Sequence, residues 1–297
     1  MKCDLCPRKC LVDRKKGEKG ICGQTENLKV ARAALHFWEE PCISGDAGSG
    51  AVFFSGCPLH CVFCQNENIA NGTVGKEISV ERLAEIFLEL QEKGANNINL
   101  VTPGHFVPQI TKALDLAKQE GLKLPIVYNT SSYETVETIK RLEGYVDIYL
   151  PDFKYMSPVL SKKYSHAPDY AEVAKAAIAE MVRQTGKAVF VNGDEDNLIL
   201  SGTIVRHLTL PGCMADSMQI LKYLHETYGD MIYISIMNQF TPLSNLEKYP
   251  ELNRRITDEE YETLVDYAIE IGIENGFIQE GDTAEESFIP AFDCEGV

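Results

Sequence analysis

Three cysteines within eight residues are the part of this sequence that points most directly to chemistry. Cys57, Cys61 and Cys64 have the spacing C-x3-C-x2-C and follow the apolar run at 51–55. Three thiolates can bind three irons of a 4Fe–4S cluster, because such clusters normally take one Cys per iron. The fourth iron is then open to a small-molecule ligand, as in catalytic zinc sites with three protein ligands. Two alternatives stay open, a zinc site completed by His60 and thiols with a structural role only.

A second group of cysteines lies at the N-terminus. Cys3, Cys6, Cys10 and Cys22 have the spacing C-x2-C-x3-C-x11-C, and four ligands in twenty residues are typical of a metal site. Zinc would form a small structural knuckle, whereas iron would form an auxiliary iron–sulfur cluster or a rubredoxin-like centre. The sequence leaves both metals open. Three further cysteines stand alone and are expected to be core or surface thiols: Cys42, Cys213 and Cys294.

Composition limits the class of protein. The N-terminus has no apolar signal-peptide core, and no apolar run reaches the roughly 18 residues of a membrane span. We therefore expect a cytoplasmic protein without a membrane partner, in which ten cysteines bind metal or do chemistry. The net charge of −16 argues against a nucleic-acid partner, although residues 1–32 carry nine Lys/Arg against four Asp/Glu. Those basic residues are expected to offset the charge of a thiolate cluster.

The remaining sequence alternates between strand-like and helix-like segments. Short runs rich in β-branched and aromatic residues, apolar on both faces, predict parallel strands covered by helices. These runs lie at 51–55, 97–101, 125–129, 147–151, 202–211 and 231–237. Amphipathic helical patterns lie at 79–94, 108–121, 133–144, 169–186, 215–229 and 257–272.

Six strands alternating with helices predict an α/β fold, a partial (βα)6 barrel of the TIM type rather than the full eight units. The expected domains are a Cys-rich metal-binding segment at 1–45, the barrel at 46–280 and a loosely packed acidic tail at 281–297. Residues 187–202 predict a hairpin inserted before the fifth barrel strand. Because α/β barrels carry their sites at the carboxyl ends of the strands, the three-cysteine loop lies where chemistry is expected.

At this loop the sequence resembles the radical S-adenosylmethionine (radical SAM) superfamily. The stretch SGCPLHCVFCQN is most similar to the pyruvate formate-lyase activating enzymes and to their relatives with a Cys-rich N-terminus. The resemblance implies a 4Fe–4S cluster whose open iron binds the amino and carboxylate groups of S-adenosylmethionine. It also implies reductive cleavage of that cofactor to methionine and a 5′-deoxyadenosyl radical, which abstracts hydrogen from a substrate. An electron donor such as flavodoxin or ferredoxin would supply the electron.

The resemblance also assigns residues at the ends of the second and third predicted strands. Where the family has Gly-Gly-Glu, this chain reads TPGH at 102–105. Gly104 is expected to keep a backbone contact to the cofactor, and His105 either faces the cavity or is a loop histidine without a catalytic role. Asn129 and Thr130 resemble the family's Thr-Asn-Gly ending and are expected to contact the cofactor.

The fourth and fifth strand ends carry charged candidates. PDFK at 151–154 resembles the family's Asp-Leu-Lys, which implies that Lys154 pairs with the carboxylate of S-adenosylmethionine and that Asp152 orients the site. One of Arg206 and His207 is expected to point into the barrel. A buried arginine needs a carboxylate partner, and Asp152 is the candidate.

The substrate is the least determined part of the sequence. An open barrel leaves a lateral gap that could admit a polypeptide loop, so we expect a protein or peptide hydrogen donor, for example a glycyl radical enzyme. The stretch at 46–51 lacks the Arg that activating enzymes carry there. Rearrangement of a small molecule stays open as an alternative reaction. A rival hypothesis of another class is a non-catalytic iron–sulfur or zinc protein used in electron transfer or regulation.

Overall fold

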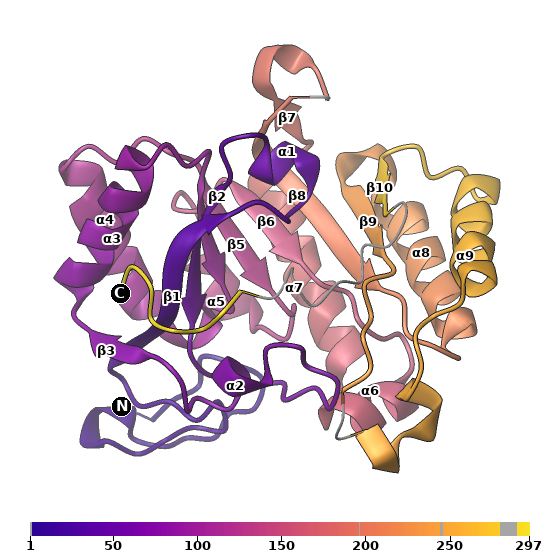
Figure 1. Ribbon diagram of the computed structural model, residues 1–297, viewed down its shortest axis with the longest axis horizontal. Coiled ribbons are helices and arrows are strands. Elements are labelled where there is room, and N and C mark those ends of the chain that lie inside the picture. The colour runs from indigo at the N-terminus through magenta and orange to yellow at the C-terminus, as the bar shows by residue number, and fades with distance from the viewer. Residues whose placement is uncertain (1, 196, 244–245, 280–289) are drawn as a thin grey trace.

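The computed structural model describes residues 2–195, 197–243, 246–279 and 290–297 (Figure 1). Its strands are β1 Leu28–His36, β2 Ser49–Phe54, β3 Lys76–Ile78, β4 Ile98–Val101, β5 Ile126–Thr130, β6 Ile148–Pro151, β7 Val189–Phe190, β8 Ile199–Leu208, β9 Tyr233–Met237 and β10 Gly276–Ile278. Its α-helices are α1 Pro41–Ser44, α2 Glu67–Ala70, α3 Val80–Glu92, α4 Val107–Gln119, α5 Val136–Lys140, α6 Pro158–Ser165, α7 Tyr170–Thr185, α8 Met214–Tyr228 and α9 Asp258–Glu270.

The sheet is an open barrel. Strands β2, β4, β5, β6, β8 and β9 are consecutive parallel neighbours, which confirms the six predicted strands and their order. Strand β10 adds a short parallel edge beside β9, and β1 and β3 extend the other edge in antiparallel pairing. Among the described strands, those two edges do not pair with each other. The predicted partial barrel is therefore correct, with an antiparallel extension that the sequence analysis did not assign.

Helices begin where the sequence places their caps. The side chain of Ser79 accepts a hydrogen bond from the backbone N–H of Arg82 at the start of α3. Thr257 and Glu260 cap each other reciprocally at the start of α9. Such caps satisfy backbone donors that have no partner inside the helix, and each contributes about 1 kcal/mol to stability.

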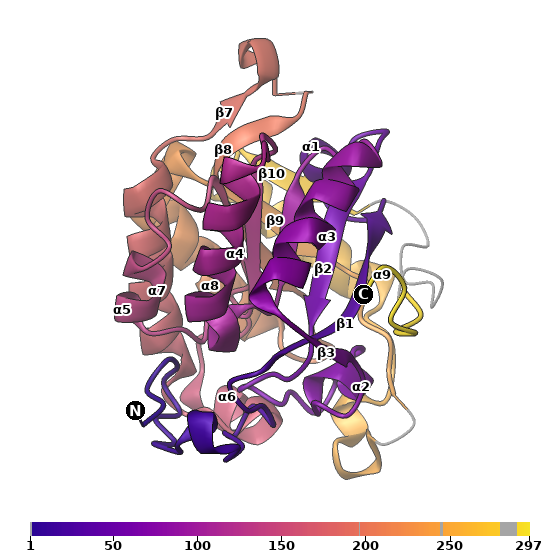
Figure 2. The same ribbon diagram turned by 90° about the vertical axis from the view of Figure 1, so that its left-hand side faces the viewer.

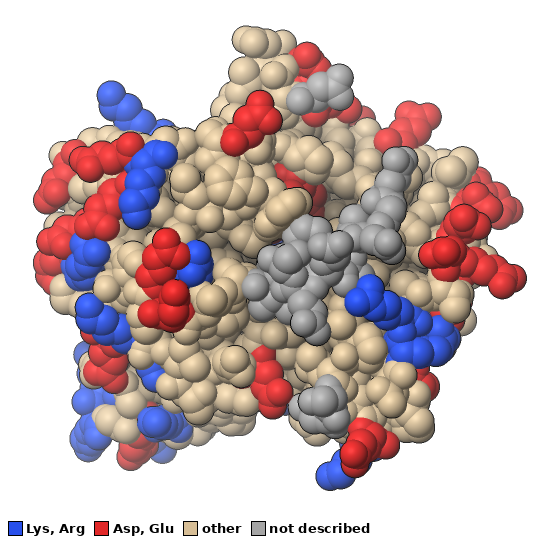
Figure 3. All heavy atoms as spheres, viewed as in Figure 1, with Lys and Arg blue, Asp and Glu red and all other residues tan. Residues whose placement is uncertain are grey.

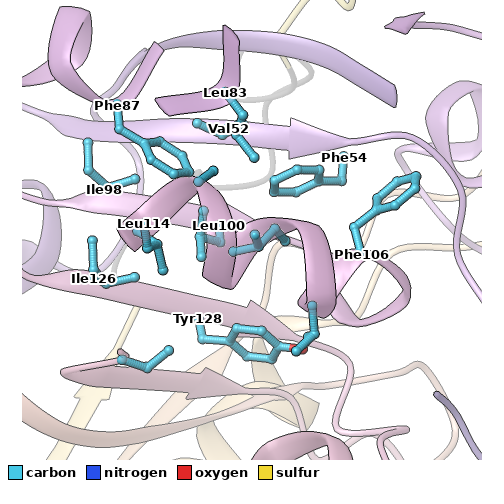
Figure 4. Packing of buried hydrophobic residues seen from close by; sticks show 14 of the residues in the cluster. Val52, Phe54, Leu83, Phe87, Ile98, Leu100, Phe106, Leu114, Ile126 and Tyr128 are labelled. Carbon is cyan, nitrogen blue, oxygen red and sulfur yellow. The ribbon is translucent and has the colours of Figure 1, made fainter. Parts of the chain in front are cut away.

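One apolar core lies between the sheet and helices α3 and α4 (Figure 4). Leu83 and Phe87 share one face of α3, four residues apart, and both side chains are fully buried. They pack in one cluster with Val52 of β2, Leu100 of β4 and Leu114 of α4. The barrel strands are apolar on both faces because their other face packs in a second apolar cluster, inside the barrel.

That inner cluster closes one end of the barrel. Val127 and Ile148 point into it, whereas their chain neighbours Tyr128 and Tyr149 belong to the outer core. Ile43 of α1 joins the inner cluster, and Figure 1 shows α1 at the end of the barrel opposite α2. The other end, where the parallel strands finish, is left for the site.

Two predictions outside the barrel have different outcomes. The antiparallel pairing predicted within 187–202 is present, but its second strand is the start of β8, the fifth barrel strand, rather than a separate strand inserted before it. Of the predicted acidic tail, 281–289 lie outside the described residues, and 290–297 are not loosely packed. Ala33 donates a backbone hydrogen bond to Glu295 at 2.8 Å, and Arg32 of β1 pairs with Asp293 at 3.3 Å. The prediction fails for 290–297 because β1, absent from the sequence analysis, offers them an edge.

Charge is unevenly spread over the surface. Figure 3 shows acidic side chains gathered on the edge of the molecule formed by α9, whose first turn holds three acids. Lys and Arg side chains lie at the corner where Figure 1 places the N-terminal segment. None of the described helices has the length and apolar character needed to cross a membrane.

Candidate active site

A cavity of about 280 Å³ lies at the carboxyl ends of the parallel strands. Its wall includes all three cysteines of the loop after β2 and side chains from the other strand ends. The lining residues include Trp38, Glu39, Cys57, His60, Cys61, Phe63, Cys64, Thr102, Asn129, Thr130, Asp152, Lys154, Arg206 and Phe240.

The three loop cysteines are partly exposed on the cavity wall, and their thiols lie close enough to repel one another when charged. Burial raises the pKa of Cys57 to about 11, and repulsion from Cys61 adds to this. Burial raises the pKa of Cys64 to about 12, with repulsion from Cys61 and then Cys57. Three thiolates this close need a bound cation, so this donor set fits an iron–sulfur cluster. Across the described part of the chain, no three Cys, His, Asp or Glu side chains are already gathered at metal-binding distances.

Neighbouring groups supply hydrogen bonds and positive charge to the thiols. The hydroxyl of Ser165, the last residue of α6, donates to Sγ of Cys61 at 3.0 Å. Nζ of Lys154 lies 2.6 Å from Oδ2 of Asp152. Burial lowers the pKa of Lys154, but the negative charges of Asp152 and Cys61 outweigh burial and the pKa lies above its ordinary value. Lys154 is therefore a permanent cation beside the cysteine loop.

The structure places Asn129, Thr130, Asp152 and Lys154 on the cavity wall, together with the loop cysteines. It does not place Gly104 and His105 there among the described lining residues; Thr102 lines the cavity instead.

His105 turns away because the chain forms a 3₁₀ turn at Gly104–Phe106. Its Nε2 hydrogen-bonds to the backbone oxygen of Ser55 at 2.8 Å, and burial lowers the pKa of His105 to about 3. A neutral histidine held beneath the loop supports the structural alternative for this residue. A Cβ at Gly104 would overlap the carboxylate of Glu134, so a larger residue there would displace that carboxylate.

The predicted partner of Arg206 is wrong. Arg206 pairs with Glu39 and Glu40, just before α1, and its Nε donates to Oε1 of Glu40 at 2.8 Å. Asp152 meets Arg206 only through a backbone bridge, since its carboxylate is occupied by Lys154. The two glutamates come from a part of the chain that carried no strand or motif signal.

The N-terminal segment lies against the cysteine loop. Figures 1 and 2 place it at the same end of the barrel as α2 and α6. Nε2 of His60 lies 2.8 Å from the backbone oxygen of Ile21. The histidine offered above as a zinc ligand thus connects the two Cys-rich segments through a hydrogen bond. Burial raises the pKa of Cys6 to about 12, and the nearby charges of Glu134, Cys22 and Cys3 raise it further.

The lone cysteines have ordinary surroundings. Cys42 and Cys213 are buried, and Cys294 is partly exposed in the segment beside β1. These positions agree with the expected core and surface thiols.

Fold and site together define an open α/β barrel protein with a cysteine loop suited to an iron–sulfur cluster. Residues 51–197 match the model of the Radical SAM superfamily, which agrees with the fold and with the cysteine loop. Similarity to this superfamily implies a 4Fe–4S cluster and S-adenosylmethionine as cofactors.

Comparisons with individual proteins agree at the level of the fold. The chain is 27% identical over 276 residues to "Uncharacterized protein MJ0674" of Methanocaldococcus jannaschii, covering 90% of this chain and 74% of that protein. It resembles Streptococcus suis SuiB bound to precursor peptide SuiA with a TM-score of 0.51 at 14% identity, covering 76% of this chain and 47% of SuiB. It resembles methylornithine synthase (PylB) with a TM-score of 0.51 at 16% identity, covering 75% of this chain and 60% of PylB. The chain thus spans about half the length of these two solved structures.

Proposed function

We propose that this protein cleaves S-adenosylmethionine reductively at a cluster held by Cys57, Cys61 and Cys64. When bound, the cluster supplies one electron and an open iron, and the resulting 5′-deoxyadenosyl radical takes hydrogen from a substrate. The observation that carries the proposal is a single cavity that holds three cysteines and the Asp152–Lys154 pair at the ends of parallel strands.

The chain's own residues bind and orient the cofactor. Lys154 is a partly buried cation and would pair with the cofactor carboxylate, while Asp152 fixes the position of the lysine ammonium group. Asn129 and Thr130 stand beside them on the cavity wall, and the amide of Asn129 would hydrogen-bond to the cofactor. The hydroxyl of Thr130 donates to Oε1 of Glu134 at 2.8 Å, so this side chain would contact the cofactor without donating to it. Such fixed polar groups favour one orientation of a bound ligand.

Aromatic side chains exclude water behind the cluster loop. Phe63, which precedes Cys64, is almost fully buried. Its ring lies 6.4 Å from Tyr155, 6.5 Å from Tyr164 and 5.9 Å from Phe240, with edge-to-face geometry. By excluding water on this side of the cavity, these packed rings would protect a reactive radical from side reactions.

For the substrate we propose a protein or peptide hydrogen donor, with a glycyl radical enzyme as one example. Three observations support it: the open edges of the sheet, an exposed Trp38 on the cavity wall, and the precursor peptide that a protein of the same fold holds. An electron donor such as flavodoxin or ferredoxin would reduce the cluster. A peptide copied from the glycine loop of a glycyl radical enzyme should increase 5′-deoxyadenosine formation, and no increase with such peptides would contradict this substrate class.

We also propose that Cys3, Cys6, Cys10 and Cys22 bind a second metal. The donor set is complete for zinc or iron, and the basic residues of the segment offset its negative charge.

The function is tested by anaerobic reconstitution with iron and sulfide, followed by dithionite and S-adenosylmethionine. We expect 5′-deoxyadenosine and methionine in equal amounts, measured by liquid chromatography. Replacing Cys57, Cys61 or Cys64 with Ala should abolish both products, whereas the matched control Cys294→Ala should keep them. A reconstituted wild-type protein that forms no 5′-deoxyadenosine would favour the non-catalytic electron-transfer or regulatory hypothesis.

A further inference from the structure

One arginine connects the two Cys-rich segments. Arg8 lies between Cys6 and Cys10, and its guanidinium donates hydrogen bonds to backbone oxygens of two distant segments. Two acceptors lie in the cluster loop, Pro58 at 2.8 Å and Leu59 at 3.4 Å. Both residues stand between the first two cysteines of that loop, so Arg8 holds the backbone on which the cluster ligands are spaced.

The other two acceptors lie at the end of α6. Arg8 donates to the oxygen of Ser165 at 2.9 Å and to the oxygen of His166 at 2.6 Å. The hydroxyl of the same Ser165 donates to Sγ of Cys61. The guanidinium also lies over the ring of Tyr133, 5.1 Å from its centroid, which fixes its plane. Arg8 therefore connects the cluster loop to a group that bonds a cluster ligand.

The backbone that carries Arg8 has little regular structure to hold it. Residues 2–13 form no helix or strand, and the turn back from Cys6 rests on a hydrogen bond from Lys9 N–H to the oxygen of Cys6 at 3.1 Å. Lys9 and Leu11 both have positive φ, 41° and 54°, a conformation that costs about 1 kcal/mol or more for residues with a side chain. Something beyond local hydrogen bonds must stabilise this shape.

The four cysteines are placed to do so. The sulfurs of Cys10 and Cys22 both pack on Gly20, each 3.3 Å from the point where a Cβ would stand. Cys3 is brought beside them by a hydrogen bond from Leu11 N–H to its oxygen at 3.1 Å. Cys6 is close enough to Cys3 and Cys22 for their charges to repel. The four thiols therefore lie near one another in this segment, although among the described residues they are not gathered at metal-binding distances. Gly20 leaves room beside Cys10 and Cys22 that a side chain would fill.

We propose that Cys3, Cys6, Cys10 and Cys22 bind a single metal ion through four thiolates, and that this ion holds Arg8 on the cluster loop so that the loop is ordered before its own cluster is inserted. Each bound thiol releases a proton, and the resulting negative site is offset by nearby Lys and Arg. Binding of the ion does not depend on the proposed function, whereas the role of Arg8 in ordering the cluster loop, called the clamp below, rests on it. Arg8 is a positioning residue, because it acts through backbone oxygens rather than on the cofactor.

The test uses full-length protein, stripped of metal under anaerobic reducing conditions and titrated with Zn²⁺ against a chromophoric chelator. We expect one Zn²⁺ per chain in the wild type and in the triple variant C57A/C61A/C64A. The double variant C3S/C22S should bind none. If the wild type binds no Zn²⁺ at one equivalent, the site does not exist; if the triple variant instead takes up about four irons, it is a cluster and the single-ion proposal is wrong.

Hydrogen exchange separates the clamp from the ion site. Zn²⁺ should slow amide exchange in residues 57–64 about tenfold in the wild type, equivalent to about 1.4 kcal/mol. Arg8→Ala should still bind one Zn²⁺ but lose this slowing, and Arg8→Lys should recover only a part because lysine cannot bond four oxygens at once. Equal slowing in Arg8→Ala and wild type would overturn the clamp. Because exchange is read before iron is added, it does not depend on cleavage of S-adenosylmethionine.

Discussion

The two Cys-rich segments differ in what surrounds their thiols. The loop of Cys57, Cys61 and Cys64 borders a cavity beside Lys154, at the ends of parallel strands. The N-terminal cysteines lie outside the sheet, and two of them, Cys10 and Cys22, pack their sulfurs on Gly20. Three ligands beside a cavity suit an open, reactive metal position, whereas four ligands facing inward suit a closed one. Surroundings and ligand number together indicate which segment does chemistry.

The largest expected effect is the difference between replacing a cysteine of the cluster loop and replacing a cysteine of the N-terminal segment. Cys61→Ala should reduce 5′-deoxyadenosine formation below detection, because it removes one of three cluster ligands. Cys10→Ala should leave measurable cleavage, with lower iron content because the loop is less well held. Iron content and product yield, measured on the same preparations, check this contrast. An equal loss of 5′-deoxyadenosine formation in both variants would contradict the distinction between the two segments.

The next effect concerns the charge beside the reactive segment. Lys154→Met should weaken binding of S-adenosylmethionine by about 10- to 100-fold, since a buried charge-assisted hydrogen bond contributes roughly 1.5–3 kcal/mol. Lys154→Arg should lose less, because it keeps the charge. Isothermal titration of the reconstituted protein measures both. An unchanged affinity in Lys154→Met would place the cofactor carboxylate elsewhere.

A third prediction concerns Glu134, which packs on Gly104 and lies near Cys6. Burial raises the pKa of Glu134 from 4.5 to about 7. The folded state then retains a proton that the unfolded state has lost, so the free energy of unfolding should fall by about 3 kcal/mol between about pH 4.5 and 7. Glu134→Gln should remove this fall and stabilise the protein at pH 8. Urea unfolding at pH 5 and pH 8 measures it, and identical pH dependence in both proteins would contradict it.

The smallest expected effect tests the link between Ser165 and Cys61. A hydrogen bond to a cluster sulfur stabilises the reduced, more negative state of the cluster. Ser165→Ala removes one such bond, which contributes about 1 kcal/mol. The reduction potential should therefore fall by about 40 mV, since 59 mV corresponds to a tenfold change for one electron. Redox titration followed by EPR gives the value. A potential that rises would show that the serine does not donate to the bound thiolate.

Sequence patterns predicted the elements with strong periodicity and the cysteine loop with its fixed spacing. They missed β1, because LKVARAALH is rich in alanine and basic residues, which have low strand propensity. Because β1 was missed, the strand edge to which residues 290–297 hydrogen-bond was missed as well. The spacing of PDFK at 151–154 located Asp152 and Lys154, but nothing in it showed that they pair with each other.

Contacts between residues far apart in the sequence could not be predicted from sequence patterns, for a physical reason. Glu39 and Glu40 reach Arg206 across more than 160 residues, and only the closing of the barrel brings them together. Arg8 forms hydrogen bonds to backbone oxygens, and a carbonyl group carries no residue identity for a sequence pattern to reveal. His105 was uncertain because a 3₁₀ turn, rather than the strand, sets its direction.

The central claim is that the loop of Cys57, Cys61 and Cys64 holds a cluster with one iron open to S-adenosylmethionine. Its most direct test is the EPR spectrum of the dithionite-reduced protein with and without S-adenosylmethionine, recorded in a C3S/C22S background so that no iron at the N-terminal cysteines contributes to the spectrum. We predict a 4Fe–4S signal whose g values change when S-adenosylmethionine is added, and no signal when the three loop cysteines are replaced. A signal that is unchanged by saturating S-adenosylmethionine, or that survives replacement of the three cysteines, would contradict the account.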